Sequence, residues 1–395
     1  IFTIRIEDLI PNYLSNFYSS KSNISSEKVF SYLDDYIDLI LHLRDQSNCI
    51  CLVNDFTAPR RTIHELQSNS DIHNQVHKIN SRLRDKLKDV KGVYIAGFES
   101  SIYDSGVANS LDDRMLYYAQ APYTSELLFT LSQHYVKLIK TISKPRKKVL
   151  VVDLDNTLWG GILGEDGIKG IQIGNDYPGN IFLEIQKCIK SYSDKGIILA
   201  INSKNNLIDV EEVFNKHPEI SLKLSDFSVT KINWESKEKN LLEISKELNI
   251  GLDSIVFIDD SSFEIGLIKA SLPEVECIQF KENLILNLEI IRNIDSFNSL
   301  EITEEDKQKK VLYKNEEERR EIRSKSTNVE EYLHQLEMKA VLSRVDNNSF
   351  GRTLQLINKT NQFNLTGKRF TDLELEKKLS LSGISGFTIQ VQDKF

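Results

Sequence analysis

The sequence predicts an α/β protein with more than one domain. Between residues 149 and 279, short apolar runs of strand length alternate with amphipathic helical patterns, and such alternation is typical of a parallel sheet covered by helices. The chain has 395 residues, which is more than a single hydrophobic core usually supports. We therefore expect a parallel α/β core preceded and followed by further domains.

The composition excludes several classes of protein. Apolar residues make up 40% and charged residues 27% of the chain, as in globular proteins. The net charge of −8 argues against a nucleic-acid partner, because binding to phosphates needs a positive field. No apolar run approaches the ~20 residues of a membrane span, and no signal peptide is visible. We expect a cytoplasmic protein with no membrane partner, whose scattered cysteines are reduced and buried.

Residues 1–145 are predicted to form an amino-terminal α/β domain. The patterns indicate helices at 29–43, 76–87 and 125–139 and strands at 49–53 and 92–96. A short basic linker, residues 144–148, follows them. Neither a Gly-Asp-Ser nor a G-x-S-x-G nucleophile turn is visible in this part, so a scaffold or docking role is favoured over a second catalytic centre.

Residues 146–298 are predicted to form the catalytic domain. The apolar runs indicate strands, and the patterns with a period near 3.6 residues indicate helices. In chain order they are strand 149–154, helix 180–193, strand 196–201, helix 207–215, helix 237–248, strand 253–258, helix 262–269 and strand 275–279. Strands that alternate with helices imply a parallel, doubly wound sheet.

Residues 299–395 are predicted to form a partial carboxy-terminal α+β domain. The charged segments 301–310 and 316–321 indicate a solvated helix face. Beyond them we expect a strand at 339–344, a helix from residue 350 and a final strand at 386–392 with no evident partner. The chain starts without Met and stops after this strand, so we expect a fragment of a longer polypeptide.

Acidic residues follow two of the predicted strands. Asp153 and Asp155 come directly after the first strand, and Asp259 and Asp260 close a later one. In a parallel α/β sheet, ligands bind beyond the carboxyl ends of the strands. Neighbouring carboxylates can hold an oxygen-seeking cation such as Mg²⁺, while one attacks phosphorus and another handles a proton.

Two further polar positions fit the same chemistry. Ser203 and Lys204 follow a strand, where a hydroxyl and backbone N–H groups could hold a phosphoryl oxygen. Lys237 stands at a predicted helix start, where its charge could neutralise the nucleophile and the phosphate. Each feature alone is weak, but their common position at strand ends or helix starts indicates a phosphoryl-transfer site.

In this order, D-x-D-x-T, Ser, Lys and D-D resemble the motif set of the haloacid dehalogenase superfamily. The resemblance implies a Rossmann-like core, a Mg²⁺ ion and an aspartyl-phosphate intermediate. It implies Asp153 as nucleophile and metal ligand, Asp155 as general acid/base and backbone-carbonyl ligand, and Asp259 as the remaining metal ligand, with Asp260 assisting. Ser203 would then bind a phosphoryl oxygen, and Lys237 would neutralise charge.

A finer resemblance, to the FkbH-like family, covers most of residues 110–395. It rests on residues 154–167, 176–179, 203–206, 233–234 and 358–365. It implies a role in polyketide biosynthesis. The glyceryl unit of 1,3-bisphosphoglycerate would lose phosphate and be loaded onto the phosphopantetheine thiol of an acyl carrier protein. It also implies an acetyltransferase-like fold for the carboxy-terminal region, whose amides at 358–365 have either a binding or a structural role.

The motif neighbours are assigned to substrate binding. The glycine-rich run after the aspartates shows no helical pattern and is expected to fold as a small hairpin over the site, leaving it open to a carrier-bound substrate. The substrate-binding residues on this reading are Thr157, Trp159, Gly160, Gly161 and Lys204.

One position departs from the family pattern. FkbH-like sequences often show Cys before the Ser-Lys pair, and here Asn202 occupies it, which puts an enzyme thioester in doubt. The alternatives are direct transfer to the carrier thiol, a plain phosphatase of the same superfamily acting on a small phosphoester, and a scaffold module without transfer activity.

Overall fold

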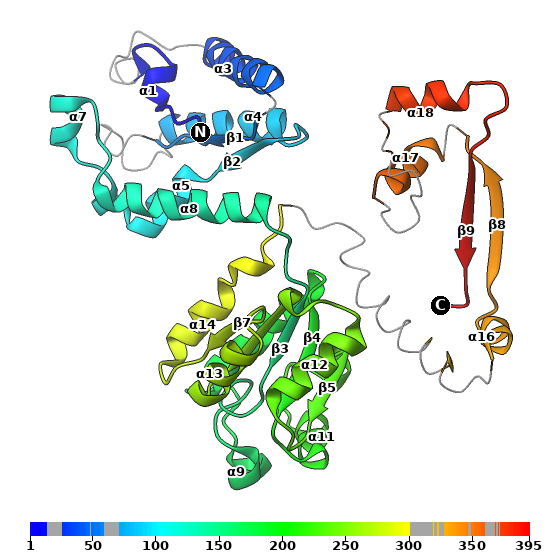
Figure 1. The fold of residues 1–395 in the computed structure, drawn as a ribbon. Coiled ribbons are helices and arrows are strands. Elements are labelled where there is room, and N and C mark those ends of the chain that lie inside the picture. Colours follow the sequence, from blue (N-terminus) through cyan, green and yellow to red (C-terminus); the bar gives the residue numbers. More distant parts are fainter. Residues whose placement is uncertain are drawn as a thin grey trace. The chain divides into compact units, whose positions relative to one another are not determined.

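The computed structural model describes residues 1–13, 26–47, 49–58, 71–300, 319, 322–323, 328–346, 349–359, 368, 370 and 372–395. The chain divides into two compact units, residues 1–146 with 294–301 and residues 147–293 with 302–395, drawn in Figure 1. The charged segments at 301–310 and 316–321 and the amide-rich run at 358–365 lie almost entirely outside the described residues. The domain limits at 145 and 298 stay predictions.

A sheet of five parallel strands forms the core of the second unit, in the order β5–β4–β3–β6–β7. Its central strands β3, β4 and β6 are buried along their whole length, as is typical of a parallel sheet covered on both faces. The strands are β3 (Val149–Val152), β4 (Ile198–Ser203), β5 (Val229–Ile232), β6 (Ile255–Asp259) and β7 (Glu276–Gln279). This arrangement confirms the predicted parallel α/β core.

Helices cover this sheet. Side chains of α12 and α13 pack with Val149, Val151 and Phe257 on one face, while α10 contacts β4 and α14. The next residues along β3 point the other way, because side chains alternate along a strand. The helices are α9 (Leu163–Gly170), α10 (Gly179–Asp194), α11 (Leu207–Lys216), α12 (Lys237–Leu248), α13 (Ser262–Ser271) and α14 (Leu284–Arg292), with short 3₁₀ turns η1 (Leu224–Asp226) and η2 (Leu252–Ser254).

The strand order reverses at the centre of the sheet. The chain runs from β3 outward to β4 and β5, and then returns to the other side of β3 for β6 and β7. The crevice between β3 and β6 is therefore a topological switch point, where ligands bind in open parallel sheets. The register sets Val152 beside Ile258, so the residues that follow these strands emerge next to each other.

Two local expectations need correction. The edge strand β5 was not predicted from the sequence, because exposed Thr230 and half-exposed Lys231 interrupt its apolar pattern. The expected hairpin after the aspartates exists only at its base, where Gly160 and Gln172 exchange two backbone hydrogen bonds. Between them the chain forms α9, which is broken at Gly167.

The first unit contains two parallel strands, β1 (Cys51–Asn54) and β2 (Val93–Ala96). Apolar side chains of α3, α4 and β1, among them Leu33, Leu83 and Val53, form its core. Cys51 is buried, but the expectation of burial is wrong for Cys49, which is exposed, and Cys188 and Cys277 in the second unit are only partly buried. The helices are α1 (Ile6–Leu9), α3 (Ser26–Ser47), α4 (Asp71–Leu87), α5 (Phe98–Ser105), α6 (Val107–Ser110), α7 (Asp113–Ala119) and α8 (Ser125–Ser143), and η3 (Asp295–Phe297) joins this unit.

The carboxy-terminal residues form an antiparallel strand pair, β8 (Lys339–Arg344) with β9 (Phe387–Gln392). The expectation that the last strand lacks a partner was therefore wrong. The described helices here are α16 (Val329–Gln335), α17 (Phe350–Lys359) and α18 (Asp372–Leu379). Likeness of this region to an acetyltransferase stays a prediction.

Across the described part of the chain, no helix has both the length and the apolar character that a membrane crossing requires.

Candidate active site

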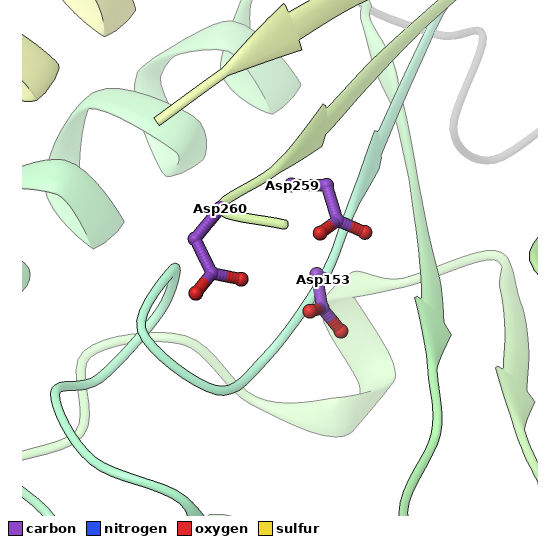
Figure 2. Close-up of side chains that lie close together, drawn as sticks. All are labelled: Asp153, Asp259 and Asp260. Atoms are coloured by element: carbon purple, nitrogen blue, oxygen red, sulfur yellow. The ribbon is translucent and has the colours of Figure 1, made fainter. Parts of the chain in front are cut away.

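Three carboxylates meet at the switch point of the sheet. Asp153 directly follows β3, Asp259 ends β6, and Asp260 is the next residue (Figure 2). One oxygen atom from each lies within 4.8 Å of the other two. Asp153 is 6% exposed and Asp259 is 0% exposed, so both acids are held away from bulk water.

Backbone contacts between the two strands fix these acids. The N–H of Asp153 donates to the carbonyl of Ile258 at 3.0 Å, which extends the β3–β6 ladder by one residue. The Oδ1 atom of Asp259 accepts from the N–H of Ser261 at 2.9 Å. Both carboxylates are therefore placed by the regular sheet and the turn that follows it.

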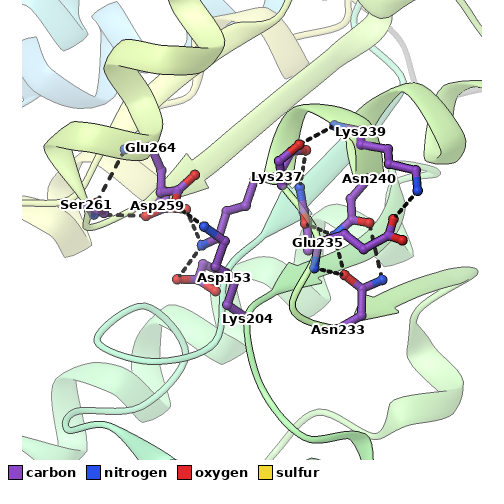
Figure 3. A network of polar contacts seen from close by, with 12 residues as sticks. Asp153, Lys204, Asn233, Glu235, Lys237, Lys239, Asn240, Asp259, Ser261 and Glu264 are labelled. Atoms are coloured by element: carbon purple, nitrogen blue, oxygen red, sulfur yellow. Dashed lines mark hydrogen bonds and ion pairs between the residues drawn. The ribbon is translucent and has the colours of Figure 1, made fainter.

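Lys237 provides the positive charge at this site. Its Nζ atom lies 2.6 Å from Oδ2 of Asp259 and 2.9 Å from Oδ2 of Asp153, as Figure 3 shows. Lys237 is the first residue of α12, which is capped by the Ser236 hydroxyl. Burial alone lowers the pKa of the Lys237 ammonium, but the two carboxylates outweigh it and raise that pKa. The lysine is thus charged although it is 3% exposed.

The three acids outnumber this lysine, and the pKa values of Asp259 and Asp260 are raised. Burial, followed by the charge of Asp153, raises the pKa of Asp259 to about 7 in spite of Lys237. The same causes raise the pKa of Asp260. The three carboxylates therefore destabilise one another unless a further positive charge joins them.

The donor set fits a hard divalent cation such as Mg²⁺. The Oδ1 atom of Asp153 is buried and accepts no hydrogen bond from any described residue, and a buried acceptor without a partner is costly. Carboxylate oxygens are the ligands that Mg²⁺ prefers. Asp153, Asp259 and Asp260 could therefore hold the cation, which would satisfy this oxygen and balance the excess charge.

The carboxylate of Asp155 does not belong to this group of three. Its Oδ1 atom accepts from the indole N–H of Trp159 at 2.9 Å and from the backbone N–H of Leu163 at 3.1 Å. Its Oδ2 atom accepts from the side-chain amide of Asn205 at 2.9 Å. The carboxylate of Asp155 is thus held by three other donors, and metal binding by Asp155 through its backbone carbonyl stays a prediction.

The residues after the aspartates shape the loop. Thr157 and Trp159 are both 0% exposed, and their assignment to substrate binding stays a prediction. A Cβ atom at Gly160 would come within 2.8 Å of Gln172 and Phe182. Gly161 has a φ of +91°, in the region that glycine tolerates best. Both glycines are therefore required by the geometry of the loop, and their assignment to substrate binding stays a prediction.

Ser203 and Lys204 lie at the same edge of the sheet, because β4 pairs in parallel with β3. Ser203 is 2% exposed, and its hydroxyl lies 3.1 Å from the side-chain nitrogen of Asn205. The ammonium of Lys204 is half-exposed and paired with Glu264 at 2.7 Å. A substrate anion at Lys204 would therefore compete with Glu264. Neither Asn205 nor Glu264 was predicted from the sequence; the polar run after Ser203 was the only signal for Asn205.

Asn202 belongs to a buried amide network. Its Nδ2 atom donates to the backbone carbonyl of Lys237 at 2.9 Å, and its Oδ1 atom accepts from Asn240 at 2.9 Å. Asn240 in turn exchanges hydrogen bonds with Asn233 (Figure 3). Asn202 is 0% exposed. It fixes the start of α12, and with it Lys237, which gives this residue a structural function.

Comparisons with known proteins find solved structures that resemble this chain. No family model matches the sequence, and no curated protein matches it. The solved structure of the amino-terminal part of a Bacteroides fragilis protein, containing a phosphatase domain and complexed with Mg, is 26% identical to this chain. That match has a TM-score of 0.57 and covers 73% of this chain and 84% of the other.

A second match carries no structural argument. It is an uncharacterized protein from Corynebacterium glutamicum, 14% identical, with a TM-score of 0.25 over 37% of this chain and 93% of the other. The fold conclusion therefore rests on the Bacteroides match together with the strand order β5–β4–β3–β6–β7. The core of this chain is a Rossmann-like fold of the haloacid dehalogenase type.

Proposed function

We propose that this chain is a magnesium-dependent phosphatase with Asp153 as its nucleophile. The observation that carries the proposal is the buried Asp153 carboxylate, with one oxygen paired to Lys237 and the other without a partner among the described residues, beside Asp259 and Asp260. The similarity to a phosphatase-domain structure complexed with Mg supports it.

Each residue then has a defined task. Asp153 attacks phosphorus, the bond from phosphorus to the leaving oxygen breaks, and Asp155 gives that oxygen a proton. Water then hydrolyses the aspartyl phosphate, and Asp155 takes a proton from it. Lys237 and Ser203 bind phosphoryl oxygens. Bound Mg²⁺, held by Asp153, Asp259 and Asp260, would supply charge neutralisation and orient the phosphoryl group.

The first test is phosphate release from a panel of small phosphoesters with the full chain. Release should require Mg²⁺ and should stop when EDTA removes it, because the three carboxylates otherwise repel an incoming phosphate. Continuous release in EDTA would contradict the metal assignment. A bound ion should stabilise the folded state by about 2.7 kcal/mol at 100 times its Kd. If no ester releases phosphate and Mg²⁺ does not stabilise the chain against heat, the proposed function is overturned.

The finer proposal concerns the substrate. We propose 1,3-bisphosphoglycerate as the donor and the phosphopantetheine thiol of an acyl carrier protein as the acceptor, in a polyketide pathway. The support is the sequence resemblance to the FkbH-like family. The thiol would displace phosphate from the acyl phosphate to form a thioester, and the Asp153 site would hydrolyse the remaining phosphate. Because Asn202 is buried in its amide network, we favour direct transfer to the carrier thiol.

Intact mass of the carrier tests this step. With donor and Mg²⁺ present, the holo-carrier should gain one glyceryl unit, and the apo-carrier, which has no thiol arm, should gain nothing. Phosphate release without a mass gain would favour a plain phosphatase acting on a small phosphoester. If phosphate release and a mass gain are both absent, a scaffold module without transfer activity is favoured.

A further inference from the structure

One buried amide joins two residues with different tasks. Asn205 is 5% exposed, and its Nδ2 atom lies 2.9 Å from Oδ2 of Asp155 and 3.1 Å from Oγ of Ser203. An amide nitrogen carries two hydrogens, so it can donate one to each partner. The group proposed to protonate the leaving oxygen and the group proposed to bind the phosphoryl oxygen are therefore linked through a single side chain.

The other contacts of Asp155 come from a rigid loop. Trp159 is completely buried, and its ring packs edge-to-face on Phe214 with centroids 6.0 Å apart. Its indole N–H and the N–H of Leu163 hold Oδ1 of Asp155. These two donors fix Oδ1, so the rotation of the carboxylate about its Cβ–Cγ bond depends on the partner of Oδ2. That partner is Asn205.

We infer that Asn205 is a positioning residue for Asp155. It sets the carboxylate plane so that Oδ2 faces the position of the leaving oxygen beside Ser203. The inference rests on the proposed function, because Asp155 needs a set orientation only if it delivers a proton. Proton transfer requires a group within hydrogen-bond reach, and general acid catalysis contributes roughly 10²–10⁴-fold. Replacing a side chain that only supports the fold would change kcat/KM by the same factor for all substrates.

The leaving group provides the test. Phenyl phosphate expels a weakly acidic alcohol that needs a proton, whereas p-nitrophenyl phosphate expels a stable anion that does not. kcat/KM reports the steps up to departure of the leaving group, so it does not depend on the later hydrolysis of the aspartyl phosphate. Asn205→Asp removes both donors with little change of shape. The matched control is Asn206→Asp, the same chemical change at the next residue, whose side chain is exposed and contacts Trp234 and Asp209.

We expect Asn205→Asp to lower kcat/KM for phenyl phosphate about 10–10² times more than for p-nitrophenyl phosphate, because it removes part of the general acid contribution. Asp155→Asn should show the same selectivity, and the double variant should show no more, because coupled groups are not additive. Asn206→Asp should leave the ratio of the two values unchanged. An equal loss for both substrates in Asn205→Asp would overturn the inference.

A spectroscopic signature separates this inference from the proposed function. The chain contains two tryptophans, so fluorotryptophan labelling gives two fluorine resonances, which Trp234→Phe assigns. Asn205→Asp should shift the Trp159 resonance through Asp155, and Asn206→Asp should shift only that of Trp234. If the wild type hydrolyses neither these two esters nor any other ester of the panel, and Mg²⁺ does not stabilise it against heat, the proposed function fails and the spectrum decides alone. An unmoved Trp159 resonance then overturns the positioning of Asp155 by Asn205, and a shift supports that positioning but not its catalytic purpose.

Discussion

Replacing Asp153 by asparagine should lower the rate of phosphate release by about 10⁴-fold or more, the scale on which loss of a covalent nucleophile acts. Asparagine has nearly the same shape as aspartate, but its neutral amide is a poor nucleophile and a poor cation ligand. The carboxylate faces Asp259 and Asp260 at the switch point, so one substitution removes both the attacking group and a metal ligand. Phosphate release under saturating Mg²⁺ measures the effect.

The control for Asp153→Asn is Asp253→Asn, an exposed carboxylate in the turn before β6. It makes the same chemical change outside the acidic group and should leave the rate within about twofold of wild type, as surface substitutions usually have little effect. Circular dichroism should show both variants folded. A rate for Asp153→Asn above one tenth of wild type would remove Asp153 from the role of nucleophile.

Replacing Lys237 by methionine should lower the free energy of unfolding by about 3–5 kcal/mol in metal-free buffer. The ammonium is buried between Asp153 and Asp259 at 2.9 and 2.6 Å. Removing one partner of a buried ion pair leaves uncompensated charge, which costs several kcal/mol. Methionine keeps the length and packing of the side chain, so the loss reflects charge. Urea unfolding in EDTA measures it.

The matched control is Lys239→Met on the same helix. Lys239 is exposed and pairs with Glu235 at 2.7 Å, and exposed pairs contribute about 0–1 kcal/mol. Adding Mg²⁺ should recover part of the stability lost in Lys237→Met, because the cation supplies positive charge between the same carboxylates. A loss below about 1 kcal/mol, the value for a surface pair, would show that the site does not depend on this lysine for its charge balance.

The sheet and the acidic site followed from local patterns in the sequence. The apolar residues of β3 and β6 end abruptly in aspartates, and acids at the ends of two buried strands together indicate a ligand site. Lys237 was suggested by its place at a helix start. Parallel pairing of β3 with β6 then brings Asp153 and Asp259 together. Lys237 reaches both from the start of α12, although its position in the sequence is 84 residues (237 minus 153) beyond Asp153.

The features that could not be predicted from the sequence depend on contacts between distant residues. Asn205 is an amide among other amides, and only the folded loop shows that it bonds Asp155 rather than solvent. The packing of Trp159 on Phe214, which buries the indole ring, likewise depends on a residue 55 positions (214 minus 159) further along the chain. β9 seemed to have no partner because β8 precedes it by more than 40 residues, and spacing alone does not indicate which strands pair.

The central position of β3 has a consequence during synthesis. Val149 pairs with Ile198 on one side and with Ile255 on the other, and 106 residues (255 minus 149) separate Val149 from the second partner. At roughly 5–20 residues per second, a ribosome needs about 5–20 s to make that partner. Throughout this interval the most apolar strand of the sheet has an open edge, which can pair with other chains. The nascent chain is therefore most vulnerable to aggregation before β6 emerges.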